Sequence, residues 1–402
     1  MRQQQRFFYR SVWVILCGLL LLFVSQRDQV NAGGPLFVSE LGRPFFWPAA
    51  IGRGLPWTPD QGRLGRLSNA DAIRFVADSF AVWQNVPLTR ARFVQSGQLP
   101  VDVTASNFMS VLDGLVNDCL ESRGCITPIV FDTDGRIIDA VFGRGASSQI
   151  LGFAGPSVFR GNQILQGRAV LNGRFGTADL QGTMIHEFGH LMGLDHSQLN
   201  VSSGLDATTR NDNEVPTMFP FIVQDSENLH LDDMASIGFL YPSQLFLQRG
   251  QISGQVLLPD GRGFQGANVI ARNVEDPRFT AVSSVSGFLH RGTRRGENFG
   301  STDPSLLGFY QIVGLPDGRY TVEVEPIRSI FTDGSAVGPL NPPADLLFPP
   351  EFYSGDAESA SDNPNSRAEI EVTGGARVTD INIILNVGNQ PQWAAVKQYR
   401  RP

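Results

Sequence analysis

The segment HEFGHLMGLDH, from His186 to His196, places three histidines, a glutamate and a glycine at the spacing H-E-x-x-H-x-x-G-x-x-H. In a helix, His186 and His190 lie one turn apart on one face, so both imidazoles can bind the same metal ion. Gly193 tolerates a positive φ and can end that helix, which lets His196 approach the ion from a loop. Three imidazoles suit zinc and leave a fourth coordination position for water, and Glu187 can act on that water as a general base.

The motif needs a helix to position it, and residues 177–192 are predicted to form one. The face opposite the histidines carries apolar side chains at spacings of four, four and three, which are Leu180, Met184, Phe188 and Leu191. A lone helical histidine is usually structural, and a bare H-E-x-x-H arises by accident. This motif fixes five identities over eleven positions and takes three of the five histidines in the chain, which favours a catalytic zinc site.

Composition and charge exclude other classes of function. The chain has 402 residues, enough for two or three domains, and its 42% hydrophobic content permits packed cores. The net charge is -7, and no block of lysine and arginine follows the N-terminal region. Nucleic acid and anionic membranes are therefore not expected as partners.

Residues 1–32 have the pattern of a secretory signal peptide. A basic region is followed by an apolar run of thirteen residues from Val12 to Val24, and small residues for cleavage lie at 30–32. A membrane anchor is the alternative, but a spanning helix needs ~20 apolar residues. We therefore expect cleavage after Ala32, a secreted extracellular protein and no stable membrane insertion.

The order of elements between residues 67 and 245 predicts an α+β domain. A helix is expected from Ser68 or Asn69 to Val86, because apolar residues repeat on one face and the first residues can cap it. Short strands are expected next, and the metal-bearing helix follows. These strands are placed at residues 91–94, 99–104, 129–131, 149–154 and 168–172. The preceding segment, 33–66, is rich in glycine, proline and arginine and is expected to be a leader or surface-wrapping segment.

Two further features of this region could bind metal or form cross-links. Cys119 and Cys125 remain after signal removal, and export favours a disulfide between them over a thiolate metal pair. The segment FDTDGRIID contains Asp132, Asp134 and Asp139. These carboxylates either bind calcium together with backbone oxygens or belong to an ordinary turn.

Four segments resemble the matrixin family of metzincin zinc peptidases and occur in the family's order, namely AVWQNVPLTRARFV, HEFGHLMGLDHS, PTMFP and LDDMASIGFLYP. The resemblance covers about residues 65–245. It implies a twisted sheet with an edge strand, an active-site helix, a Met-turn and a C-terminal helix. It also implies a zinc endopeptidase acting on proteins or peptides, with His186, His190 and His196 as metal ligands and Glu187 as the base.

The resemblance gives roles to residues outside the motif as well. Met218 would belong to the Met-turn beneath the metal, although a loop methionine is more often a gap-filler. Residues 219–222 would line a pocket for an apolar side chain just after the cleaved bond, and the strand at 149–154 would pair with substrate backbone. Matrixins hold the mature N-terminus with an aspartate near Asp232 and Asp233, but the helix dipole also explains these residues. The segment 33–66 has no cysteine for the family's cysteine switch.

Residues 250–388 are predicted to form a β-sandwich, because short alternating strands are separated by Pro-Asp-Gly turns. The phrases ISGQVLLPDGRGFQGANVIA and GFYQIVGLPDGRYTVEV are similar to the carboxypeptidase regulatory-like, transthyretin-type domain. Such a module either contacts a surface, glycan or protein or only stabilises the enzyme. Residues 273–308 are expected to be a long insertion, and 389–402 a flexible tail.

A second hypothesis comes from another class of function. The chain could be a secreted, non-catalytic adhesin or binding protein, with a metzincin domain as metal-bound scaffold and the β-sandwich as the binding module. Glu187 argues against this hypothesis, because a scaffold has no chemical need for that carboxylate. The sequence thus predicts a monomeric, secreted zinc endopeptidase.

Overall fold

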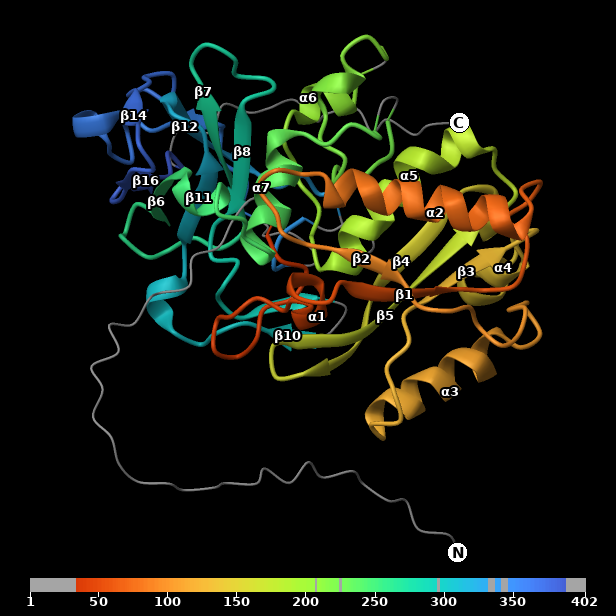
Figure 1. Cartoon of the computed structure of the whole chain (residues 1–402). Coiled ribbons are helices and arrows are strands. Elements are labelled where there is room, and N and C mark those ends of the chain that lie inside the picture. Colours follow the sequence, from red (N-terminus) through yellow and green to blue (C-terminus); the bar gives the residue numbers. More distant parts are fainter. Residues whose placement is uncertain are drawn as a thin grey trace, which may run out of the picture.

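The computed structural model describes residues 34–206, 208–223, 226–294, 297–331, 337–340 and 346–387. The predicted signal peptide and the C-terminal tail lie outside these residues. In the part of the chain that is described, no helix is long and apolar enough to cross a membrane. An α+β unit with most of the helices lies beside a unit made mostly of strands (Figure 1).

The first unit is built on a five-stranded sheet in the order β2-β1-β3-β5-β4. Its strands, in chain order, are β1 (Leu55–Pro59), β2 (Phe93–Gln95), β3 (Pro128–Asp132), β4 (Gly152–Arg160) and β5 (Gln163–Asn172). Four of them run parallel, whereas β4 pairs antiparallel with β5 and forms one edge. The outer backbone groups of β4 pair with no other strand of the described chain.

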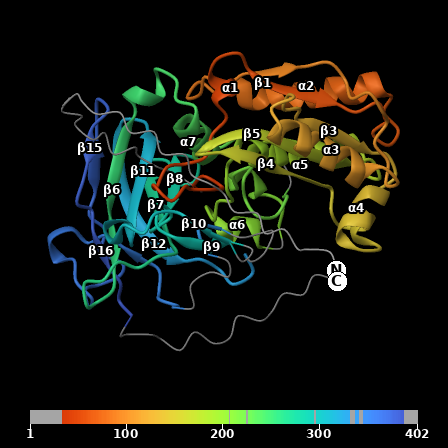
Figure 2. The same cartoon turned by 90° about the horizontal axis from the view of Figure 1, so that it is seen from below.

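Helices cover both faces of this sheet (Figure 2). The helices of this unit are α1 (Pro48–Ile51), α2 (Asn69–Gln84), α3 (Phe108–Leu120), α4 (Arg136–Phe142) and α5 (Thr177–Met192), and α6 (Val201–Gly204) and α7 (Leu231–Leu240) follow towards the second unit. Alternating residues of β3 point to opposite cores, as strand geometry requires. Ile129 and Phe131 share a core with α2 and α5, whereas Val130 belongs to a core with α3 and α4.

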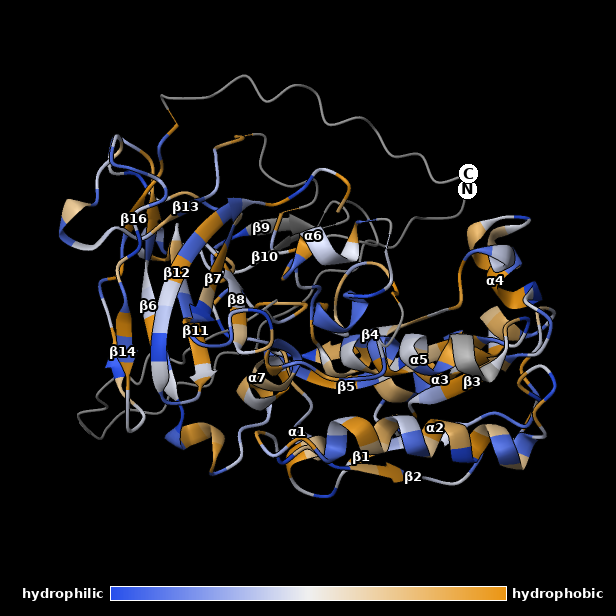
Figure 3. Ribbon diagram, turned by 90° about the horizontal axis from the view of Figure 1, so that it is seen from above, coloured by the Kyte–Doolittle hydropathy of each residue, from blue (hydrophilic) through white to orange (hydrophobic). Residues whose placement is uncertain are grey.

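Helix α2 holds α5 in place. Ser68 caps α2 by accepting a hydrogen bond from the backbone of Asp71 at 3.2 Å. Hydrophobic and hydrophilic residues alternate along α2 (Figure 3). On its buried face, Phe80 stacks on Phe188 of α5 with ring centroids 3.8 Å apart, and the Trp83 indole donates to the carbonyl of Ile185. The helix that carries His186 and His190 is thus fixed from its apolar side.

The structure differs from the sequence expectations in several elements. The segment 33–66 was expected to be a leader or surface wrap, but it contributes β1, which lies between β2 and β3, and several of its apolar side chains are buried in the core. Residues 99–104 form no strand, and β4 begins at Gly152 instead of Gln149. Helices α3 and α4 were not expected. The helix 177–192 is confirmed at both ends.

The disulfide between Cys119 and Cys125 is confirmed. The carboxylates of the segment FDTDGRIID have hydrogen-bond or ion-pair partners within the chain. Asp132 accepts a hydrogen bond from the backbone of Ile138, and Asp139 accepts one from the backbone of Ser147. Asp134 pairs with Arg136. These carboxylates stabilise a turn and the start of α4, as the alternative prediction held.

Residues 250–387, called here the two-sheet unit, contain two sheets around one core. The first consists of β6 (Gly250–Leu257), β11 (Phe309–Leu315), β15 (Arg377–Val378) and β16 (Ile383–Ile384). The second consists of β7 (Ala267–Asn273), β8 (Ala281–Val285), β12 (Gly318–Pro326), β13 (Glu351–Phe352) and β14 (Ile370–Val372). A hairpin of β9 (Gly292–Arg294) and β10 (Glu297–Phe299) follows β8. The expected insertion at 273–308 therefore contains an edge strand of the second sheet.

A buried carboxyl group makes the stability of the two-sheet unit depend on pH. Burial, with Glu358 and Asp362 nearby, raises the pKa of Glu351 from 4.5 to about 8. The folded protein therefore binds this proton more tightly than the unfolded chain does. The resulting contribution to stability is complete below the unfolded pKa and is lost as the pH rises through about 8.

Replacing Glu351 by glutamine should remove this pH dependence, because the amide oxygen can still accept the backbone N–H of Asn386. Between pH 6 and pH 9, we expect the thermal midpoint of Glu351→Gln to gain about 5 °C or more relative to wild type. Glu371→Gln, on the exposed surface of the same unit, is the matched control. Parallel curves for wild type and Glu351→Gln would contradict the prediction.

Candidate metal centre

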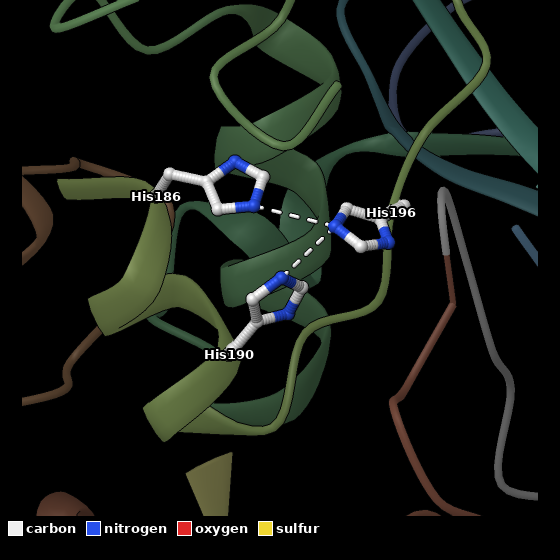
Figure 4. A group of neighbouring side chains, drawn as sticks. All are labelled: His186, His190 and His196. Atoms are coloured by element: carbon white, nitrogen blue, oxygen red, sulfur yellow. Dashed lines mark hydrogen bonds between the residues drawn. The ribbon is translucent and has the colours of Figure 1, made fainter. Parts of the chain in front are cut away.

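The three histidines of the motif converge on one point (Figure 4). His186 and His190 extend from α5, and His196 comes from the loop that follows. The Nε2 atom of His196 lies 3.0 Å from Nε2 of His190 and 3.3 Å from Nε2 of His186. Two ligands of a tetrahedral zinc ion, each at about 2.0–2.1 Å, are separated by ~3.3 Å. The donor set therefore fits a single ion of this kind.

Backbone carbonyls orient two of the imidazoles. Nδ1 of His186 lies 2.7 Å from the carbonyl oxygen of Thr217, and Nδ1 of His190 lies 2.9 Å from that of Leu194. A ring whose Nδ1–H donates to a carbonyl presents the lone pair of Nε2, which is the arrangement of metal-binding histidines. Burial lowers the pKa of His186 to about 4, so this imidazole is neutral at physiological pH.

The turn at Gly193 brings His196 back to the helix. Gly193 has a φ of 95°, and its N–H closes the last turn of α5 on the carbonyl of His190. The N-terminal segment runs beside this turn, since Leu36 donates to the carbonyl of Gly193 at 2.7 Å and Asp195 donates to that of Gly34. This contact could not be predicted from local sequence patterns, because it joins segments far apart in the chain.

Glu187 lies between the metal ligands and the edge of the sheet. Its side chain is half-buried and packs near Gly152 of β4. Burial raises the pKa of Glu187 to about 8, and a hydrogen bond from the backbone of Ala154 partly opposes this shift. The carboxyl group can therefore hold or release a proton near neutral pH, which is a requirement for a general acid or base.

The turn containing Met218 packs against the metal-bearing helix. Met218 is buried, and a Cβ added at Gly189 would lie only 2.3 Å from its sulfur atom. Asp233 holds the turn by accepting hydrogen bonds at 2.9 Å from the backbone N–H groups of Thr217 and Met218. The same turn supplies the Thr217 carbonyl that orients His186. Asp233 is therefore a structural residue of the site, a role that the sequence did not indicate.

Residues 219–222 only partly form the expected pocket wall. Phe219 is fully buried, whereas Phe221 and Ile222 are 40% and 38% exposed. Phe331, from the two-sheet unit, packs against Phe219 and Phe221 with ring centroids 5.5 and 5.7 Å away. The apolar surface at residues 219–222 was expected to be formed by the first unit alone. Phe331 shows that the second unit also packs against it.

Comparisons with known proteins add little to this geometry. No family model and no curated protein matches the chain. Among solved structures, the Bacillus anthracis TIE protein shares 14% identity over 34% of this chain and 16% of its own, with a TM-score of 0.18. The group B streptococcus pilus 2b backbone protein shares 14% identity over 35% of this chain and 43% of its own, with a TM-score of 0.15. The chain spans less than half the length of either protein.

Proposed function

We propose that this protein is a secreted zinc-dependent endopeptidase of the matrixin type. The observation that carries the proposal is the convergence of three Nε2 atoms on one point beside Glu187 and the sheet edge. His186, His190 and His196 would hold the metal. Imidazole sites of this kind also bind cobalt or nickel, so zinc is proposed from the donor set and the motif.

Zinc held by the three imidazoles would supply Lewis acidity for the attack of water on a peptide carbonyl. Glu187 accepts the proton of the attacking water and delivers it to the leaving amine. An extended substrate can add to the open edge of β4, because the outer backbone groups of that strand face no other strand of the described chain. The backbone of Ala154, in the same edge strand, donates a hydrogen bond to Glu187. A substrate paired with this strand would therefore lie next to the base.

The exposed side chains of Phe221 and Ile222 predict an apolar preference just after the cleaved bond. Cleavage-site profiling of a peptide library should show at least a tenfold enrichment of large apolar residues at that position, because one well-buried apolar side chain contributes about 1.5–3 kcal/mol. Phe331→Ala should weaken this preference by removing the support behind Phe221. A strong preference for charged residues there would contradict the prediction.

Gelatin and casein zymography with and without a chelator tests the proposed function directly. Clearing that disappears with the chelator and returns with zinc supports a metallopeptidase. Metal binding without any clearing would favour the alternative of a secreted binding protein that uses the first unit as a scaffold.

A further inference from the structure

The residues directly after the third histidine are buried against the two-sheet unit. Ser197, Gln198 and Asn200 are polar, yet each is no more than 2% exposed. Such residues need internal hydrogen-bond partners. Most of these partners come from the second unit and lie more than 70 residues further along the chain.

Ser197 belongs to a buried group of hydrogen bonds with Asp232 and Ser283. The Ser283 N–H donates to Oδ1 of Asp232 at 2.6 Å, and its hydroxyl lies 3.1 Å from the same oxygen. The hydroxyls of Ser197 and Ser283 are 3.2 Å apart. Ser283 lies on β8 of the two-sheet unit, whereas Asp232 lies in the first turn of α7. The neighbour of Asp232, Asp233, holds the turn of Met218.

Gln198 makes a second set of contacts across the same boundary. Its amide nitrogen donates to Oε1 of Glu325 at 2.8 Å and to the carbonyl of Pro326 at 3.1 Å. Its amide oxygen accepts the backbone N–H of Arg328 at 2.7 Å. The two-sheet unit thus binds both ends of this side-chain amide, one residue beyond Ser197.

Asn200 continues the pattern. Its oxygen accepts a hydrogen bond from Arg272 at 2.7 Å. Its nitrogen donates to the carbonyl of Arg278 at 2.9 Å and to that of Glu214, in the first unit, at 2.6 Å. The backbone of Asn200 has a φ of 55°. Polar side chains at three positions after His196 are therefore fixed by the second unit.

His186 and His190 are positioned by a packed helix, whereas His196 lies on the loop that follows it. The backbone of this loop is held in the first unit, because Asp195 donates to Gly34 and Ser197 donates to Met218. The side chain of Ser197, in contrast, is held at the boundary with the second unit. We propose that the two-sheet unit is a structural part of the metal centre, with Asp232 and Ser283 as positioning residues that fix His196 through Ser197. This inference rests on the proposed metal site. The second unit would then contribute to metal binding, in addition to the contacts with surfaces or partners expected from the sequence.

Cobalt binding to the full chain tests the inference, because the affinity and the visible spectrum of bound Co²⁺ report ligand geometry without any need for peptidase activity. Loss of a residue that supports a ligand typically weakens binding 10–100-fold. We expect Asp232→Ala to bind Co²⁺ at least tenfold more weakly, with an altered spectrum, and Ser283→Ala about threefold to tenfold more weakly. Asp232→Asn should stay within threefold of wild type, because its amide oxygen can accept from Ser283.

Ser286→Ala is the matched control. Ser286 is also buried and follows β8, but its hydroxyl bonds only Phe264 and Ala267 within the two-sheet unit. The Ser286→Ala variant should bind Co²⁺ with the affinity and the spectrum of wild type. If Asp232→Ala does not fold, the comparison of Ser283→Ala with Ser286→Ala decides the question.

Wild-type affinity and spectrum in both Ser283→Ala and folded Asp232→Ala would overturn the inference. Failure of the proposed function gives a different pattern, in which wild type binds Co²⁺ but cuts no peptide. In that case the affinity ratios between the variants still measure the role of the two-sheet unit.

Discussion

Glu187→Gln is expected to bind about one zinc ion per chain and to lose peptidase activity by a factor of about 10²–10⁴, the usual contribution of a general base. Glutamine has nearly the same shape, and its amide oxygen can still accept the hydrogen bond from Ala154. It cannot take up a proton from water. The three imidazoles proposed to bind the metal are unchanged, so the loss of catalysis should not be accompanied by a loss of metal binding. Elemental analysis and peptide turnover on the same preparation measure the two effects.

Gln181→Ala provides the control for this variant, because Gln181 is exposed on the same helix and precedes the motif. Its zinc content and turnover should equal those of wild type. Undiminished turnover of Glu187→Gln would refute the assignment of the base.

Of the substitutions named here, Asp233→Ala is expected to cause the largest fall in the free energy of unfolding. Both carboxylate oxygens are buried and accept three backbone N–H groups, those of Thr217, Met218 and His230. Each buried N–H left without a partner costs about 1–3 kcal/mol, so the free energy of unfolding should fall by roughly 3–5 kcal/mol. The carbonyl of Thr217 also orients His186, and zinc affinity should fall with stability.

Chemical denaturation with and without excess zinc measures this effect. Asp260→Ala removes an exposed carboxylate in a turn of the two-sheet unit and should leave the midpoint unchanged. A change of less than about 0.5 kcal/mol in Asp233→Ala, the range of ordinary surface substitutions, would contradict the role assigned to Asp233.

The helices that position the metal ligands could be predicted from local signals. Ser68 caps α2 and Gly193 ends α5, and the apolar spacing of both helices matches the buried faces that the structure shows. Strand β1 could not be predicted in this way. Its sequence, LPWTP, has the proline content of a loop, and its place between β2 and β3 depends on partners far along the chain.

In the candidate site, too, the features set by local sequence could be predicted and the long-range contacts could not. The spacing of the motif was enough to name His186, His190, His196 and Glu187. Helix geometry determines which of the residues on α5 share a face and can therefore lie close together. The contact of Ser197 with Ser283 could not be found from the sequence, since serine has no local pattern that indicates a partner 86 residues away. The support of Phe221 by Phe331 is another such long-range contact.

A zinc titration of the metal-free protein, followed by peptide cleavage, tests the central claim most directly. The three converging imidazoles predict that cleavage is absent without metal and rises linearly until one equivalent of zinc has been added. His196→Ala, which removes the loop ligand, should not recover activity at one equivalent. Cleavage that persists in the metal-free protein, or no cleavage with one zinc bound, would contradict the account.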